Sequence, residues 1–198
     1  MEAVLSTLEP DFQGCEILVT GFFEDERPLR GAGGYVDWRF NGLLSRYLIE
    51  KKLLGVWKET VLIPSQGRIG PSLILFVGLG KAKEYSYLRL RELFPFLFAV
   101  LQKLKVSKIC FSLPEDEGHQ VESGKLVEVL MESLADMIDE RLSGEGETWI
   151  KGLRLFFADE EDHFLQLLLG LQTAQSILRE RLDIQIQTAH GSRSPVQG

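Results

Sequence analysis

Apolar runs and helix-spaced apolar stripes alternate along this sequence. Continuous runs rich in β-branched and aromatic residues predict strands over residues 15–23, 59–64, 72–77, 107–113 and 153–157. Apolar positions three or four residues apart predict helices over 36–48, 85–105, 126–138 and from 159 to about 182. Strands that alternate with helices predict a three-layer α/β sandwich, in which a mixed and mostly parallel sheet carries helices on both faces.

Glycine and proline refine this outline at two places. Gly31, Gly33 and Gly34 predict a loop that leads into the first helix. Pro95 lies inside the helical pattern of residues 85–105 and lacks the amide donor that a helix interior needs. We therefore expect either a kink or two separate helices there.

The second half of the chain predicts weaker elements. Residues 143–148, SGEGET, predict a flexible connection, and the alternating DIQIQ of residues 183–187 predicts a marginal edge strand. The final segment is composed like a mobile tail. We expect one domain over residues 1–188 and a flexible tail over residues 189–198.

Apolar residues surround most of the last predicted helix. They are Phe164, Leu165, Leu167, Leu168, Leu169 and Leu171. A helix that is apolar all round is usually buried on more than one side, so a central packing helix is one interpretation. The alternative is a surface that contacts another copy of the chain or a protein partner. Carboxylates over residues 159–162 suit the start of this helix, where the helix dipole is positive.

Composition fits a soluble globular protein of 198 residues with a net charge of −7 and 44% hydrophobic residues. No apolar stretch approaches the roughly 20 residues that span a bilayer, and the first residues, MEAVLSTLEPDFQG, have neither a basic start nor a continuous apolar run, so we expect no leader sequence. We expect a cytoplasmic protein without membrane contact. The two cysteines, Cys15 and Cys110, lie among apolar residues, where free thiols behave as small hydrophobes.

Charge is unevenly distributed. Residues 115–147 hold eleven acidic and two basic side chains, whereas residues 81–108 hold seven basic and two acidic ones. The basic stretch could meet phosphates, but solvated helix faces carry such charges routinely. Because the whole chain is acidic, nucleic-acid binding is not expected.

The first candidate site is RGAGGYVDWRFNG, residues 30–42. Gly31, Gly33 and Gly34 stand before a helix, where backbone N–H groups and the helix dipole favour an anion such as phosphate. Asp37 and Asn41 are one helical turn apart and could bind a ribose or a base edge. The spacing matches neither GxGxxG nor GxxxxGK[ST]. A glycine-rich surface loop and ordinary helix capping by Asp37 are the alternatives.

The second candidate site is GLGK, residues 78–81. Gly78 and Gly80 flank the end of a predicted strand, and Lys81 supplies a compact positive charge for an anionic group. In α/β sheets ligands bind where strands end and helices begin, which would bring both glycine segments to one edge. A tight turn after a buried strand explains the motif equally well.

No catalytic or metal-binding constellation is evident. His119, His163 and His190 lie in an acidic loop, at a helix start and in the tail, and the sequence contains no HExxH, paired CxxC or GxSxG motif. We therefore assign no catalytic residue, no metal ligand and no cofactor.

Residues 39–81 resemble the N-terminal domain of the leucyl (cytosol) aminopeptidase family. The similarity rests on ordered elements, namely Asn41–Leu48, Gly55–Lys58, Thr60–Pro64 and Leu73–Lys81 with its terminal GLGK. It extends from Cys15 to about Ala158. The resemblance implies a macro-domain-like fold that helps to assemble a hexamer. Peptidase chemistry in that family belongs to a separate domain with two metal ions and an NTDAEGRL signature, which this sequence does not contain.

Three functional hypotheses follow from these observations. The leading one is a free-standing, non-catalytic module that acts in protein association or regulation, as a homo-oligomer or with a protein partner. The second is a macro-domain-like binder of a phosphate-bearing small molecule, such as ADP-ribose or a nucleotide, at the two glycine segments. The third is a DNA-binding regulator, because some bacterial members of the family bind DNA. Peptidase activity is not expected.

Overall fold

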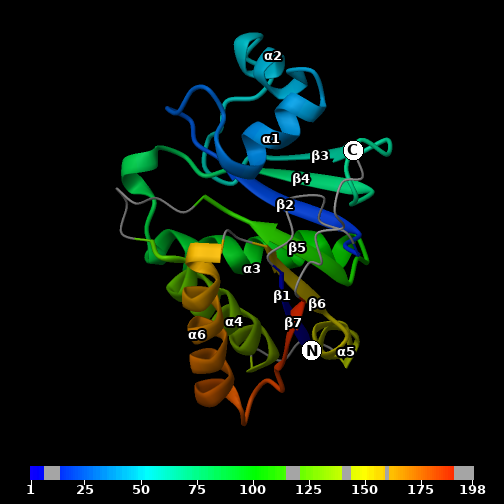
Figure 1. Ribbon diagram of the computed structural model, residues 1–198, viewed down its shortest axis with the longest axis vertical. Helices are drawn as coiled ribbons and strands as arrows, with labels where there is room; N and C mark the ends of the chain where they lie inside the picture. Colours follow the sequence, from blue (N-terminus) through cyan, green and yellow to red (C-terminus); the bar gives the residue numbers. More distant parts are fainter. Residues whose placement is uncertain (7–13, 115–120, 140–143, 159–160, 190–198) are drawn as a thin grey trace, which may run out of the picture.

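A seven-stranded sheet organises the molecule, in the order β3-β4-β2-β5-β6-β1-β7 (Figure 1). The computed structural model describes residues 1–6, 14–114, 121–139, 144–158 and 161–189. The strands are β1 (Glu2–Ser6), β2 (Ile17–Phe22), β3 (Thr60–Pro64), β4 (Leu73–Gly78), β5 (Lys108–Ser112), β6 (Arg154–Ala158) and β7 (Gln185–Ala189). Among these described strands, only β3 and β4 pair antiparallel. This confirms the mixed, mostly parallel sheet.

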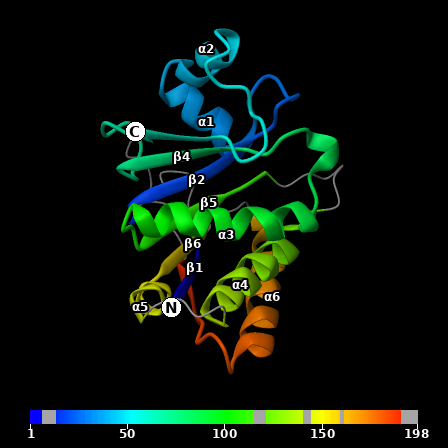
Figure 2. The same cartoon turned by 180° about the vertical axis from the view of Figure 1, so that it is seen from behind.

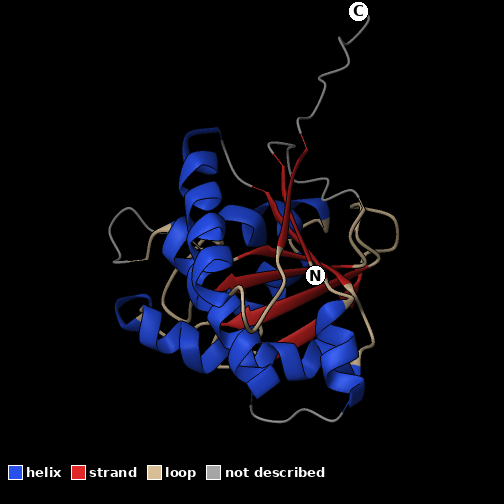
Figure 3. Cartoon of the chain, turned by 90° about the horizontal axis from the view of Figure 1, so that it is seen from below, coloured by secondary structure: helices blue, strands red, loops and turns tan. Residues whose placement is uncertain are grey.

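Helices cover both faces of the sheet, as the sequence predicts (Figures 2 and 3). They are α1 (Gly31–Arg39), α2 (Leu43–Ile49), the short 3-10 helix η1 (Ala82–Glu84), α3 (Tyr87–Lys103), α4 (Ser123–Asp139), α5 (Gly144–Lys151) and α6 (Glu161–Leu178). Side chains of α3 to α6 share one hydrophobic cluster, and those of α1 and α2 share the other. Within β2, Ile17 and Val19 join the first cluster while Leu18 and Phe22 join the second, because successive strand residues point to opposite faces.

All six predicted strands are confirmed, including the edge strand β7, but the sequence analysis missed β1. This strand pairs in parallel with both β6 and β7. Ala3 and Leu5 are fully buried, and Val4 is 5% exposed. A five-residue strand with only three apolar residues is too short to stand out by periodicity, so its tertiary neighbours decide its conformation.

The predicted glycine loop and the single helix over residues 36–48 are both wrong. Gly31 is the first residue of α1, and Gly33 and Gly34 lie in its first turns. Helix α1 ends at Arg39, and α2 begins after Gly42, whose φ of 71° is left-handed. Glycine adopts that conformation without steric strain. The chain therefore turns at Gly42, and the helix-spaced apolar residues of 36–48 belong to two helices instead of one.

Helix α3 continues through Pro95, so the two-helix alternative is wrong. Pro95 lies on the exposed side, whereas Phe94, Leu97 and Phe98 are fully buried on the opposite side. The amide that proline lacks would have bonded the carbonyl of Arg91. Arg91 is exposed, and water can therefore satisfy that carbonyl.

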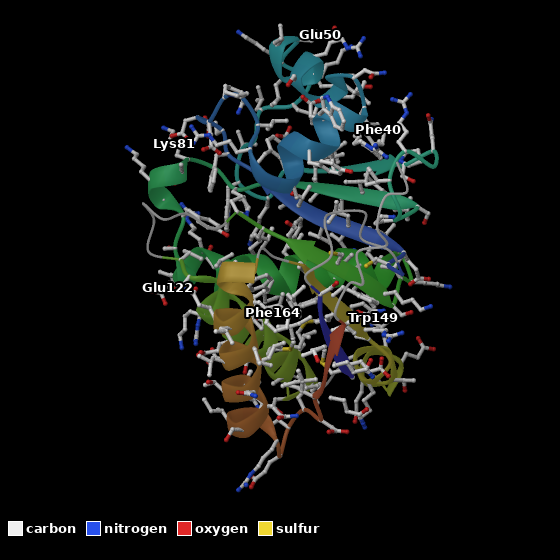
Figure 4. All side chains as sticks on the ribbon, in the orientation of Figure 1. Phe40, Glu50, Lys81, Glu122, Trp149 and Phe164 are labelled. Atoms are coloured by element: carbon white, nitrogen blue, oxygen red, sulfur yellow. The ribbon has the colours of Figure 1, made fainter. Side chains whose placement is uncertain are left out.

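The predicted flexible connection over residues 143–148 is also corrected, because α5 begins at Gly144. The other end of this helix is anchored in the core. Ile150 is fully buried, and the indole nitrogen of Trp149 donates to the carbonyl of Val106 at 2.8 Å (Figure 4). Tertiary contacts thus order a segment whose composition favours flexibility.

Helix α6 is not buried all round, so the interpretation as a central packing helix is wrong. Leu167, Leu171 and Leu178 are buried against α4 and the sheet. Leu165 and Leu169 are 66% and 62% exposed. The helix is shorter than predicted, and the carboxylates at residues 159–160 and the tail from residue 190 lie outside the described residues.

Candidate functional site

The two glycine segments meet at the end of β2. A Cβ atom on Gly21 would lie 2.6 Å from Cδ1 of Leu79 and 3.1 Å from Cδ of Pro114. A Cβ atom on Gly33 lies 3.4 Å from the carbonyl oxygen of Gly21. Helix α1, the turn after β4 and the segment after β5 therefore converge on one residue. This is the carboxyl edge of the parallel strands, where α/β sheets bind ligands.

Helix α1 presents an uncapped N-terminus at this edge. Arg30 occupies the N-cap position without a side-chain hydrogen bond, and the first turn holds no acidic residue. Gly34 has no room for a side chain, since its Cβ would lie 2.4 Å from the carbonyl oxygen of Leu29. The amides of Gly31 and Gly33 donate to no group within the described residues. Such amides, with the positive end of the helix dipole, suit an anion.

Asp37 serves α2 instead of this edge, which confirms the capping alternative. Its Oδ1 accepts hydrogen bonds from the backbone N–H groups of Leu44 at 2.8 Å and Ser45 at 3.1 Å. Its Oδ2 accepts a third hydrogen bond from the hydroxyl of Ser45. Asn41 lies beyond the C-terminal end of α1, exposed and with a φ of 55°. Asp37 and Asn41 therefore belong to the corner between α1 and α2, whereas the three glycines form the beginning of α1.

The GLGK segment forms a tight turn packed against residues 55–57. A Cβ atom on Gly78 would lie 2.1 Å from the carbonyl oxygen of Val56. Gly80, with a φ of 71°, donates its N–H to the carbonyl of Gly55 at 2.9 Å. These contacts confirm the turn interpretation for both glycines. Lys81 is exposed and lies at the outer margin of the molecule (Figure 4).

A loop that the sequence analysis did not single out, residues 24–27 after β2, is hydrogen-bonded to the GLGK segment. The carboxylate of Asp25 accepts the N–H of Ala82 at 2.9 Å, and the N–H of Glu24 donates to the carbonyl of Gly80 at 2.7 Å. The guanidinium of Arg27 donates to the carbonyl of Phe23 at 2.7 Å. No local motif marks Asp25 or Arg27, because their partners lie elsewhere in the sequence or on the backbone.

Titratable groups do not assemble a catalytic centre within the described residues. No group of three histidine, cysteine, aspartate or glutamate side chains gathers there in metal-binding geometry. Cys15 and Cys110 are free thiols, and burial raises the pKa of Cys110 well above its usual value, so its thiol is unreactive. His119, His190 and the side chain of His163 lie outside this description.

A cavity of about 280 Å³ lies away from the carboxyl edge, between α3 and α4. It is lined by Arg91, Pro95, Glu132, Ser133, Asp136 and Met137. Arg91 pairs with Glu132 across it. No helix among the described residues is long and apolar enough to cross a membrane.

Solved structures support the fold. The structure superposes on a Trypanosoma brucei macrodomain in complex with ADP with a TM-score of 0.56 and 13% identity, over 83% of this chain and 66% of that one. It superposes on tomato leucine aminopeptidase with a TM-score of 0.57 and 16% identity, over 89% of this chain and 36% of that one. At such identities the likeness concerns the macrodomain fold alone.

Sequence comparison assigns the family. A probable cytosol aminopeptidase from Sulfurihydrogenibium sp. is 28% identical over 109 residues, which are 55% of this chain and 22% of the relative. The chain thus spans about a fifth of the curated relative's length. The model of the cytosol aminopeptidase family N-terminal domain matches residues 19–139. This chain therefore belongs to the cytosol aminopeptidase family, whose N-terminal domain it matches.

Proposed function

We propose that this protein acts in association with a second copy of itself through the outer ridge of α6. The ridge consists of Leu165, Leu169, Thr173 and Ile177, which are four residues apart and so share one face of the helix. Leu165, Leu169 and Ile177 are 66%, 62% and 66% exposed. This exposed apolar ridge is the observation that carries the proposal.

The absence of charge over residues 164–178 of α6 supports a contact surface. No charged residue occurs from 164 to 178, whereas a solvated helix face normally carries several. Interface centres are depleted of charged residues in the same way. An uncharged ridge can also face its own copy across a twofold axis without repulsion. A helix of 18 residues is roughly 27 Å long, so the contact is small and the association weak.

Light scattering after size exclusion tests this association. We expect the mass of the wild-type protein to rise with concentration, and the double variant Leu165→Glu/Leu169→Glu to remain a monomer. Glutamate on both copies places like charges in a desolvated contact. Leu88→Glu is the matched control, because Leu88 is 70% exposed but lies on α3.

Two results would count against the proposal. One is a wild-type protein that stays monomeric at about 0.5 mM, a concentration at which even weak dimers form. The other is a dimer that persists unchanged in the double variant. Circular dichroism of each variant distinguishes lost association from lost folding.

A second candidate function is binding of a phosphate-bearing small molecule, such as ADP-ribose or a nucleotide, at the carboxyl edge. It is favoured by the uncapped start of α1 beside Gly21, where the turn after β4 also arrives. One macrodomain neighbour is described in complex with ADP. The amides of Gly31 and Gly33 would receive the phosphate. Lys81 and Arg30 would supply positive charge at the rim.

Isothermal titration calorimetry with ADP-ribose and with ADP tests this second function. Binding should be abolished by Gly33→Val, whose side chain would crowd the carbonyl of Gly21. Arg30→Glu should weaken binding without disturbing the fold, since the Arg30 side chain is 74% exposed. The absence of heat with either ligand would reject the candidate.

A further inference from the structure

Strand β3 leaves a free hydrogen-bonding edge. Among the described residues, it is the last strand on its side of the sheet and pairs only with β4. The N–H of Ser65 donates to Ser72 at 2.8 Å, and the N–H of Gly78 donates to the carbonyl of Glu59 at 2.7 Å. Because antiparallel pairs alternate, the N–H and C=O groups of Thr60 and Leu62 point outward. Another strand can form backbone hydrogen bonds with these outward N–H and C=O groups.

The side chains of β3 do little to protect this edge. Its sequence, TVLIP, contains no charged residue, although exposed edge strands usually carry charges that block pairing. Leu62 is 41% exposed. It lies on the face of the sheet that α3 covers at the neighbouring strands, whereas Val61 and Ile63 lie on the opposite face and pack toward α1 and α2. Pro64 removes only its own N–H, at the end of the strand. The edge is therefore both open and apolar.

Two cations lie beside the beginning of β3. The ammonium of Lys58 is 5.7 Å from the ring centroids of both Trp57 and Phe96. The guanidinium of Arg89 is 4.8 Å from the Trp57 centroid. Arg89 pairs with Glu84 at 3.0 Å, but Lys58 forms no ion pair within the described part of the chain. Positive charge thus remains available next to the open edge.

We propose that β3 binds an extended peptide segment of a partner protein, which adds as an eighth strand and carries an acidic residue beside Lys58. Backbone hydrogen bonds to Thr60 and Leu62 would hold the peptide, and an apolar side chain would cover Leu62. The carboxylate would meet Lys58 and Arg89. This surface is separate from the outer ridge of α6, so the failure of one proposal would not affect the other.

Charge favours such a peptide over a second copy of this chain. Two β3 strands paired antiparallel about Leu62 would place Lys58 of one copy beside residues 66–68 of the other. That turn includes Arg68, a further cation. Like charges at both ends of the pairing would disfavour it, whereas an acidic peptide complements them.

Fluorescence anisotropy with two synthetic peptides tests the proposal. The first probe alternates valine with glutamate, and the second alternates valine with lysine. We expect the acidic probe to bind at least tenfold more tightly than the basic one. Leu62→Pro, which removes an outward N–H, and Lys58→Glu should each weaken the acidic probe about tenfold or more, a change of about 1.4 kcal/mol.

Matched control variants distinguish pairing at the edge of β3 from nonspecific binding of the peptides. Ile49→Lys is the control for an exposed apolar residue away from β3, since Ile49 is 81% exposed on α2. Lysine is used at this position because proline would break the helix. Lys105→Glu is the control for net charge. Both should leave binding unchanged. Equal binding of the two probes, no binding at about 1 mM protein, or binding that Leu62→Pro and Lys58→Glu leave intact would each overturn the proposal.

Discussion

Asp37 shows how one carboxylate can hold two helices at a corner. Asp37 is 8% exposed, and both of its carboxylate oxygens accept hydrogen bonds from the start of α2. The cap is contributed from the preceding helix, because the N-cap residue of α2 is Gly42, which has no side chain. Asp37 therefore fixes the turn that orients α2 on the sheet.

Replacing this cap should destabilise the fold without touching the carboxyl edge. We expect Asp37→Ala to lower the free energy of unfolding by about 1 to 2 kcal/mol, the usual effect of losing an N-cap. Urea denaturation measures the change. Glu92→Ala, at an exposed position on α3, should shift the midpoint by much less, and an equal shift in both variants would contradict the capping role.

Glu16 joins the beginnings of β2 and β5. Its Oε2 accepts the backbone N–H groups of Ser107 at 2.7 Å and Lys108 at 2.8 Å. These backbone hydrogen bonds lower the pKa of Glu16 from its usual 4.5. The ionised carboxylate is thus favoured in the folded state.

The stabilisation from Glu16 should depend on pH in a defined direction. A lowered folded pKa gives stability that is complete above pH 4.5 and is lost as the pH falls through the folded value. We expect Glu16→Gln to be less stable than the wild type at pH 7, and the difference to shrink toward pH 3. Denaturation of both proteins across this range measures it. A difference that stays constant with pH would rule out the carboxylate's role.

At the scale of elements, α4 and α6 cross in backbone contact. A Cβ atom on Gly170 would lie 2.2 Å from the carbonyl oxygen of Gly124, and one on Gly124 would lie 2.5 Å from that of Gln166. Both contacts are with backbone, which cannot rotate away. Glycine at these two positions therefore sets how closely the helices pack.

This crossing predicts an unusual effect of alanine. In an exposed helix interior, Gly→Ala stabilises by roughly 1 kcal/mol. We expect Gly170→Ala instead to destabilise by about 1 to 3 kcal/mol, because the helices must separate. Thermal unfolding provides the measurement. Gly144→Ala is the matched control, since nothing lies within 4 Å of its Cβ, and its melting temperature should not fall.

At the scale of the whole molecule, the sequence predicted the fold class because the long elements carry strong periodic signals. Strand β4 and helix α4 were found from their apolar patterns alone. The corner at Gly42 and the helix α5 were not, because a left-handed glycine and an indole hydrogen bond to Val106 are visible only in three dimensions.

The candidate site was predictable only in part, for a related reason. The convergence of Gly33 and Leu79 on Gly21 follows from the rule that parallel strands end at one edge. The hydrogen bonds of Asp37 to α2 depend on the corner between α1 and α2, which the hydrophobic pattern of the sequence does not indicate. The contribution of Asp25 depends on a partner 57 residues away.

The same limit applies to β1, whose importance only the assembled sheet reveals. We expect Leu5→Ala to lower the free energy of unfolding by about 3 kcal/mol, because Leu5 is fully buried and a cavity would remain. Leu88→Ala, on the exposed side of α3, should change it by less than about 0.5 kcal/mol. Similar effects of the two variants in chemical denaturation would show that β1 is not firmly inserted.

The insertion of β1 between β6 and β7 also constrains the order of assembly during synthesis. Its neighbours are Arg154–Ala158 and Gln185–Ala189. At ribosomal rates, the first strand leaves the ribosome roughly ten to forty seconds before the last one. Until β6 has emerged, Ala3 and Leu5 have no native strand beside them, and they are exposed to neighbouring chains. Translation speed and chaperone access should therefore influence the yield of this protein more than its modest length suggests.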